Sequence, residues 1–429
     1  MSIYLKNATY INWETLQFIE GNLKVEKGLG GKISFIDSLP ELKEGDELMD
    51  CRNKFVTKSF GCGHHHIYSA LARGMGAPKK QPNNFYEILK YIWWVLDKCL
   101  DKDIIEASAL ATAIACAKRG VTFVIDHHSS PYAAEGSLET IAKAFDKVGI
   151  NHLLCIELSD RDGEEPKEEG LEETINYLSS GRQGLVGLHA SFTVSGDLLN
   201  KAVGLCNNYN SGIHVHVAED QMDQDLCIKD HGRRVLERFE GAGVLSFPKT
   251  ILSHCIHINE HEKSLVLKSP AWIAQNTESN LNNCVGLFNS EGLSDRIILG
   301  TDGMHSDMIR SAQNSYFTSR LDESYGLDIL YHRFRNIHRY IQTNNFLGDG
   351  ENNIVVLNYD SPTELNEKNF LSHFLYGIES SHVESVISQG SFILKEGKII
   401  NVNEDEVLSF SKEMGKRLWF KMDNCKEDL

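Results

Sequence analysis

The sequence predicts an α/β protein: a (β/α)8 TIM-like barrel plus a small β-sandwich that both chain ends form. Eight strand-like runs alternate with helical stretches between residues 56 and 345, and this alternation is typical of a parallel barrel. Short β-like runs come before this region and return after it, so the two ends can share one sandwich. The chain has 429 residues, 41% of them hydrophobic, which is enough to bury a large core.

The β-rich N-terminal part spans residues 1–55, where glycine-rich turns separate short strands. The barrel follows in residues 56–350, and residues 351–429 hold the returning β runs. Helical patterns are expected at 103–119, at 136–148 and, as an amphipathic final helix, at 404–418. The eight barrel strands are expected near residues 56–63, 121–126, 151–157, 184–188, 212–218, 249–254, 271–275 and 296–301.

Acidic residues outnumber basic residues by 60 to 43, which gives a net charge of −17. Such a surface repels nucleic acid and anionic membranes, so we expect a small-molecule substrate and neither of those partners. The N-terminus does not resemble a signal peptide, no apolar stretch has membrane-spanning length, and the ten cysteines are scattered. We therefore expect a cytoplasmic protein with reduced thiols.

Three consecutive histidines, His64, His65 and His66, directly follow the first expected barrel strand. Side chains alternate along a strand, so His64 and His66 point to one side and His65 points to the other. Two imidazoles on one side can bind one divalent metal ion, whereas His65 is expected to be structural. The pair is weak evidence by itself, because a histidine cluster can also be a solvated turn or a satisfied core group.

More histidines and carboxylates lie where other barrel strands end, which is where barrel enzymes carry their functional residues. Imidazole and carboxylate ligands suit zinc or iron. We expect one divalent ion, zinc or alternatively iron or manganese, that activates a water molecule. The side chains concerned are Asp126, His127, His128, His189, His214, His216, Glu219, His254, His257 and Asp302.

For some aromatic and histidine side chains the sequence allows two interpretations, a role in the functional site or a structural role. His214 lies deeper in its strand than His216, so a place in the core is favoured. One of His127 and His128 should face the cavity; His128 is expected to contact substrate, and the alternative is a hydrogen bond to a metal ligand. Trp93 and Trp94 can stack on a planar ligand or pack in the core.

Taken together, these motifs resemble the amidohydrolase superfamily, in the branch of metal-dependent aminohydrolases and chlorohydrolases. The closest likeness is to SsnA-type aminohydrolases, and it covers nearly the whole chain. The chain departs from the family in lacking the usual Pro-Gly pair before the first strand, which concerns a turn and not the chemistry. The resemblance rests on segments 63–75, 126–131, 216–220, 253–255, 299–303 and 360–366.

The resemblance implies one metal ion with a defined set of ligands. His64, His66, His216 and Asp302 correspond to the family's metal-binding residues. Members with two ions usually bridge them with a lysine on the fourth strand, and residues 184–189 contain no lysine. One ion is therefore favoured.

The resemblance also implies catalytic roles. Glu219 matches the glutamate that carries a proton to the substrate ring, and Asp302 would act as base toward the reactive water. His254 matches the histidine that hydrogen-bonds this water, and His189 matches one that contacts substrate. Relatives are often dimers, so a homodimer is a further expectation.

The leading hypothesis is a metal-dependent hydrolase that deaminates a small purine-, pterin- or pyrimidine-like compound by means of metal-activated water. One alternative keeps the site and hydrolyses an amide, a cyclic amide or a carbon–halogen bond. Another is a metal-binding accessory protein of a redox-linked or selenium-linked pathway.

Overall fold

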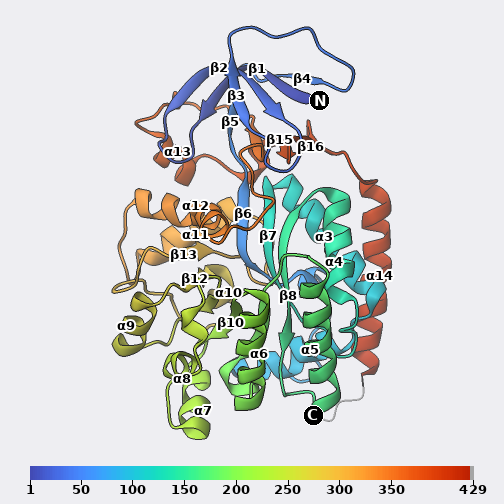
Figure 1. The fold of residues 1–429 in the computed structure, drawn as a ribbon, viewed down its shortest axis with the longest axis vertical. Coiled ribbons are helices and arrows are strands. Elements are labelled where there is room, and N and C mark those ends of the chain that lie inside the picture. Colours follow the sequence, from blue (N-terminus) through green and yellow to red (C-terminus); the bar gives the residue numbers. More distant parts are fainter. Residues whose placement is uncertain (426–429) are drawn as a thin grey trace.

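The computed structural model describes residues 1–425, and it contains a parallel barrel and a second, mixed sheet (Figure 1). Each barrel strand is buried along most of its length, as expected for strands with helices outside and packed side chains inside. The barrel strands are β6 (Phe60–His65), β7 (Val121–His128), β8 (Asn151–Leu158), β9 (Val186–Ala190), β10 (Ile213–Val217), β11 (Ile251–His254), β12 (Trp272–Gln275) and β13 (Ile297–Leu299).

Helices surround the barrel and connect its strands. Side-chain caps define several helix starts; Asp101, for example, accepts a hydrogen bond from the Ile104 amide at the start of α3. The helices are α1 (Phe85–Ile88), α2 (Trp94–Lys98), α3 (Lys102–Lys118), α4 (Ser137–Val148), α5 (Glu164–Ser179), α6 (Gly196–Tyr209), α7 (Gln221–His231), α8 (Val235–Gly241), α9 (Glu260–Lys268), α10 (Thr277–Asn282), α11 (Met308–Ser319), α12 (Leu327–Thr343), α13 (Phe370–Tyr376) and α14 (Glu404–Asn424), with short turns η1 (Ile67–Ala72), η2 (Leu89–Trp93), η3 (Ser191–Thr193), η4 (Val244–Ser246) and η5 (Ser380–His382).

Both chain ends contribute to the second sheet, which confirms that the termini form one β unit beside the barrel (Figure 1). Its nine strands form one hydrogen-bonded sheet around a separate small core. Strand β5 links the two halves, because it pairs with β1 on one side and with β14 on the other. The strands are β1 (Ser2–Ile11), β2 (Phe18–Glu26), β3 (Ile33–Ile36), β4 (Glu47–Asp50), β5 (Phe55–Lys58), β14 (Ile354–Leu357), β15 (Val383–Ser388), β16 (Ser391–Lys395) and β17 (Lys398–Ile399).

The first expected barrel strand, residues 56–63, is two strands in the structure. Residues 55–58 belong to the mixed sheet, and the barrel begins only at Phe60. The other seven expected strands each correspond to one observed strand, and the final helix extends to Asn424. Within residues 1–425, no helix has the length and apolar character needed to cross a bilayer.

A histidine-rich candidate metal site at the barrel mouth

The barrel closes where its first and last strands meet, and this closure brings together two residues 238 positions apart. The amides of Thr301 and Asp302 donate hydrogen bonds to the His64 carbonyl, at 3.0 and 3.1 Å. Gly300 permits this approach, because an added Cβ would lie 2.3 Å from Asn276 Oδ1 and 2.8 Å from His64 Cβ. The side chains of His64 and Asp302 therefore share one end of the barrel.

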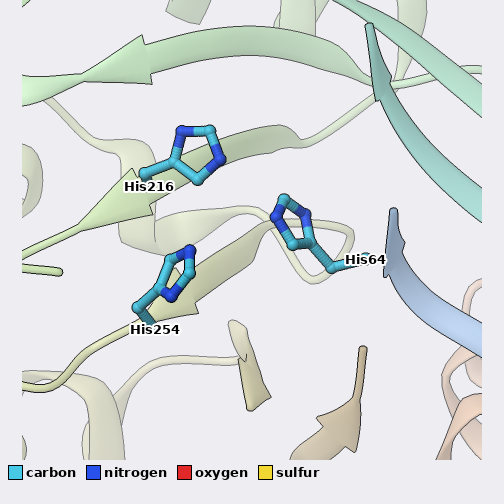
Figure 2. A group of neighbouring side chains, drawn as sticks. All are labelled: His64, His216 and His254. Atoms are coloured by element: carbon cyan, nitrogen blue, oxygen red, sulfur yellow. The ribbon is translucent and has the colours of Figure 1, made fainter. Parts of the chain in front are cut away.

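Imidazoles from three strands converge at the same place. Figure 2 shows the rings of His64, His216 and His254 directed toward one another from β6, β10 and β11. Their nearest ring nitrogens all lie within 4.8 Å of one another, and the ligand atoms of His64, His66 and Asp302 meet the same limit. Such groupings of buried nitrogen and carboxylate ligands are typical of metal centres.

Backbone hydrogen bonds fix the tautomers of His66 and His216. The Nδ1 of His66 lies 2.6 Å from the His127 carbonyl, and the Nδ1 of His216 lies 2.8 Å from the His189 carbonyl. A carbonyl only accepts, so each Nδ1 carries a proton and donates, and in the neutral ring each Nε2 carries a lone pair. The two Nε2 atoms are 3.1 Å apart, an arrangement that needs a cation or a proton between them.

The donor set fits a divalent cation. The Nε2 of His64 is buried without a hydrogen-bond partner, which is costly unless something binds it. Asp302 Oδ1 lies 3.0 Å from His66 Nε2 and 3.7 Å from His64 Nε2. His64, His66, His216 and Asp302 thus present three imidazole nitrogens and one carboxylate oxygen, a combination that suits zinc.

The electrostatics of the metal-free cluster agree with this arrangement. Burial and the surrounding histidines hold the pKa of His64 well below its ordinary value, so the ring is neutral. Burial also lowers the pKa of His66, but the charge of Asp302 outweighs it and raises the value to about 9. The proton on His66 takes a place that a cation would otherwise occupy.

Glu219 and His254 lie on the other side of Asp302. His254 Nδ1 is 2.7 Å from Asn280 Oδ1, which directs Nε2 toward Glu219 Oε2 at 3.4 Å and Asp302 Oδ2 at 3.8 Å. Asn283 holds the second Glu219 oxygen at 3.3 Å. Burial raises the pKa of Glu219 to about 7, so this carboxyl can give or take a proton near neutral pH.

The strand ends that carry these side chains have strained backbone. Ala218, His254, Cys255 and Asp302 all have left-handed φ angles, of 45°, 74°, 53° and 52°. Residues with a Cβ avoid this region, and such strain clusters at functional sites. At Ala218 the conformation is held by Asp223, whose Oδ2 accepts a hydrogen bond from the Ala218 amide at 2.8 Å.

A cavity opens over the cluster and encloses about 800 Å³, including the part that is open to solvent. His189 lies on its wall, with Nδ1 2.6 Å from Thr193 Oγ1. The helical segment of residues 85–98 forms a largely apolar part of the wall through Phe85, Leu89, Trp93 and Trp94.

Six of the expected site residues are brought together, and His189 lies beside them. The six are His64, His66, His216, Glu219, His254 and Asp302.

His128 lies elsewhere. It is fully buried, its Nε2 contacts Ser130 Oγ at 2.9 Å, and it does not line the cavity. The expected contact of His128 with substrate therefore has no geometric support. The neighbouring His127 points inward, and its Nε2 contacts the carbonyls of Leu188 and His214 at 3.1 Å.

Two further histidines have structural partners. His65 faces away from the cluster and contacts Ser306 Oγ at 3.1 Å. His214 is buried behind His64, with its Nε2 2.8 Å from His64 Nδ1. His214 therefore helps to orient His64, a function that the core interpretation did not include.

Sequence reasoning missed the carboxylates and the arginine of the cavity wall. Asp97, Glu157 and Arg161 line the cavity and contact one another. Glu157 is the second-to-last residue of β8, and Arg161 follows three residues after the end of that strand. Their position at the end of the third barrel strand was a usable signal, but that strand end carries no histidine and was not included among the candidate sites.

Comparisons with known proteins agree with the geometry. The profile of the Amidohydrolase family matches residues 55–330. A 5'-deoxyadenosine deaminase of Methanococcus vannielii is 25% identical over 413 residues, covering 91% of this chain and 95% of the relative. A 5-methylthioadenosine/S-adenosylhomocysteine deaminase of Thermoanaerobacter pseudethanolicus is 24% identical, covering 97% and 99%. Among solved structures, a zinc-containing adenosine deaminase from Xanthomonas campestris superposes with a TM-score of 0.82 at 15% identity, covering 97% and 98%.

Proposed function

The chain belongs to the amidohydrolase family and is a hydrolase, and from this premise we propose that it releases ammonia from a purine-type heterocycle. The observation that carries the proposal is the placing of Glu219, His254 and Asp302 against the histidine cluster, at the base of an aromatic-walled cavity. The deaminase relatives support a 6-aminopurine ring as the reacting group.

His64, His66, His216 and Asp302 would hold one divalent ion, with zinc proposed and iron or manganese as alternatives. The unpartnered His64 Nε2 and the facing nitrogens of His66 and His216 support this assignment. When bound, such an ion lowers the pKa of water so that it becomes a nucleophile near neutral pH.

The side chains at and beside the metal ligands transfer the protons of the reaction. Asp302 Oδ2, which faces His254 instead of the other ligands, is placed to take a proton from the attacking water. His254 Nε2, which has no other hydrogen-bond partner, is placed to accept a hydrogen bond from the attacking water and so to orient it. Glu219, with a pKa of about 7, can protonate a ring nitrogen of the substrate. The proton that Asp302 has taken from the water can then pass to the departing amino group, while Glu219 regains a proton from the newly attached hydroxyl group.

The wall of the cavity positions the ring. Trp93 and Trp94 offer aromatic surface, and His189, whose ring centroid lies 6.0 Å from that of Trp94, offers a polar contact beside them. A planar heterocycle is matched to such a space, because aromatic faces stack on it and a few polar groups fix its orientation.

The test is ammonia release from purines, pterins and pyrimidines by zinc-loaded protein, together with the variant Glu219→Gln. We expect kcat to fall about 10²- to 10⁴-fold, with metal content unchanged. Glu168→Gln, a substitution on the outside of α5, is the matched control and should be fully active.

Failure of the metal-loaded protein to release ammonia from every compound would overturn the proposal. Products that gain the mass of water without losing ammonia would indicate amide or cyclic amide hydrolysis instead. A metal-binding accessory protein would be indifferent to Glu219→Gln. The molecular mass of the metal-loaded protein in solution tests the expected homodimer.

A further inference from the structure

The cavity wall is rich in carboxylates besides those of Glu219 and Asp302. Asp97, Glu157, Asp220 and Asp223 line it. Among the lining residues that the structure describes, the only arginine or lysine is Arg161. The wall therefore has an excess of negative charge unless ligand groups balance it.

Arg161 is already occupied by carboxylates. Its Nε donates to Asp162 at 2.9 Å, its Nη1 donates to Glu157 at 2.9 Å, and its Nη2 donates to Asp97. Its side chain is only 8% exposed, and the guanidinium lies over the Trp94 ring, 5.1 Å from the centroid. Three negative charges surround this one positive charge, so Arg161 is a poor receptor for an anionic ligand.

Asp97 has one oxygen in use and one without a partner. Both of its hydrogen bonds, from Arg161 and from Ser129 Oγ at 3.0 Å, reach Oδ2. Oδ1 is buried and has no hydrogen-bond partner, although Asp97 lines the cavity. A bare carboxylate oxygen in a protein interior is unfavourable, and a donor from a ligand would satisfy it.

The cavity continues into an outer groove that has the same character. The two spaces share Trp94, Arg161, Phe192 and Asp220. The groove adds the aromatic ring of Tyr86, whose centroid is 5.5 Å from that of Trp94, and the carboxylates of Asp160 and Asp230. Aromatic faces beside carboxylates favour cations.

We propose that the substrate carries a positively charged group on the side remote from the amino group it loses, and that Asp97 receives this group. The inference rests on the proposed deamination of a purine-type ring and adds the charge of the substrate's tail. A substrate with a carboxylate or phosphate tail is excluded by the same wall.

Three matched ligands test the charge preference: 5′-amino-5′-deoxyadenosine, 5′-deoxyadenosine and adenosine-5′-carboxylate. They share one purine ring and one ribose and differ only in the 5′ group, which is a cationic amine, a neutral methyl group or an anionic carboxylate. Their affinities are measured by calorimetry with zinc-loaded Glu219→Gln protein at pH 8, in which turnover is slowed enough for binding to be measured. We expect the amine to bind at least about tenfold more tightly than the neutral compound, and the carboxylate at least about tenfold more weakly.

The variant Asp97→Asn, made in the same background, tests the residue. The preference for the amine should be lost and the carboxylate should gain affinity, while the neutral ligand binds as before. A purely structural role of Asp97 would weaken all three ligands equally. Glu413→Gln, an exposed change on α14, is the control. The ligand series measured with Asp97 in place does not depend on whether the Asp97→Asn variant folds.

The outcomes separate the two proposals. Equal affinities, tighter binding of the carboxylate, or no binding of any ligand would overturn the inference about charge. The predicted order of affinities without ammonia release by the wild-type protein would leave that inference standing and overturn the deamination of adenosine-type rings.

Discussion

At the scale of single residues, the hydrogen bond made by one ring nitrogen of a histidine determines whether the other nitrogen carries a proton or a lone pair. His254 Nδ1 faces Asn280 Oδ1 at 2.7 Å, and its Nε2 is buried without a hydrogen-bond partner, near Glu219 and Asp302. An acceptor at Asn280 therefore keeps the proton on Nδ1 and leaves the lone pair of Nε2 directed into the site.

This gives a prediction for residue 280. Asn280→Leu removes the acceptor, so we expect kcat to fall about 10- to 100-fold with little change in KM. Asn280→Asp keeps an oxygen in the same place and should retain most of the activity. Steady-state kinetics of both variants, loaded with metal, measure the difference; equal losses in both would contradict an orienting role.

The residue scale also shows what alternation along a strand can and cannot decide. Alternation separated His64 and His66 from His65 without any structure, because the three residues are consecutive. It required one of His127 and His128 to point inward but did not say which, since that depends on the register of β7 against its neighbours. In the structure, His127 reaches the carbonyls of Leu188 and His214.

At the scale of elements, the expected strand at residues 56–63 shows that a local sequence pattern cannot separate two consecutive buried strands that belong to different sheets. Val56, Thr57 and Lys58 are buried in one sheet, and residues 60–65 are buried in the other. Both segments are extended and buried, so the sequence shows one continuous run. The change of sheet occurs at Ser59, whose amide bonds to the Asn353 carbonyl, a contact with a residue 294 positions away that no local pattern contains.

The closing strands give a prediction for Gly300. A methyl group there would meet Asn276 Oδ1 at 2.3 Å and the His64 backbone at 2.9 Å. Gly300→Ala should therefore destabilise the fold by about 1–3 kcal/mol and weaken metal binding, because His64 and Asp302 are separated.

Gly204→Ala is the matched control. Gly204 lies inside α6, where an added Cβ meets nothing within 4 Å, so the change should stabilise the protein by about 0.5–1 kcal/mol. Thermal unfolding and metal affinity of both variants are the measurements. Unchanged metal affinity in Gly300→Ala would show that the contact between the first and last barrel strands does not position the metal ligands.

At the scale of the whole molecule, a buried ionic cluster joins the barrel to the mixed sheet. Lys58 of β5 lies 2.7 Å from Asp349 Oδ1, and His338 of α12 lies 2.8 Å from Asp349 Oδ2. Burial alone would raise the pKa of Asp349, but its two partners outweigh this effect and lower the pKa to about 2. Asp349 thus binds a proton less readily in the folded protein than in the unfolded chain.

The sign of the pH effect follows from that shift. The contribution of Asp349 to stability is complete above the unfolded pKa of about 3.8 and is lost as the pH falls from there toward 2. Asp349→Asn leaves Lys58 without its charged partner, so it should lower the free energy of unfolding by about 3 kcal/mol at pH 7.

Urea unfolding of both proteins between pH 7 and pH 3 measures this difference, which should shrink once the pH falls below 4. Asp225→Asn, on the outer face of α7, should change stability little at any pH. Asp349 lies outside the catalytic cavity, so the folded variant should keep wild-type kcat. A stability difference that does not depend on pH would mean that the charge of Asp349 does not hold the barrel to the sheet.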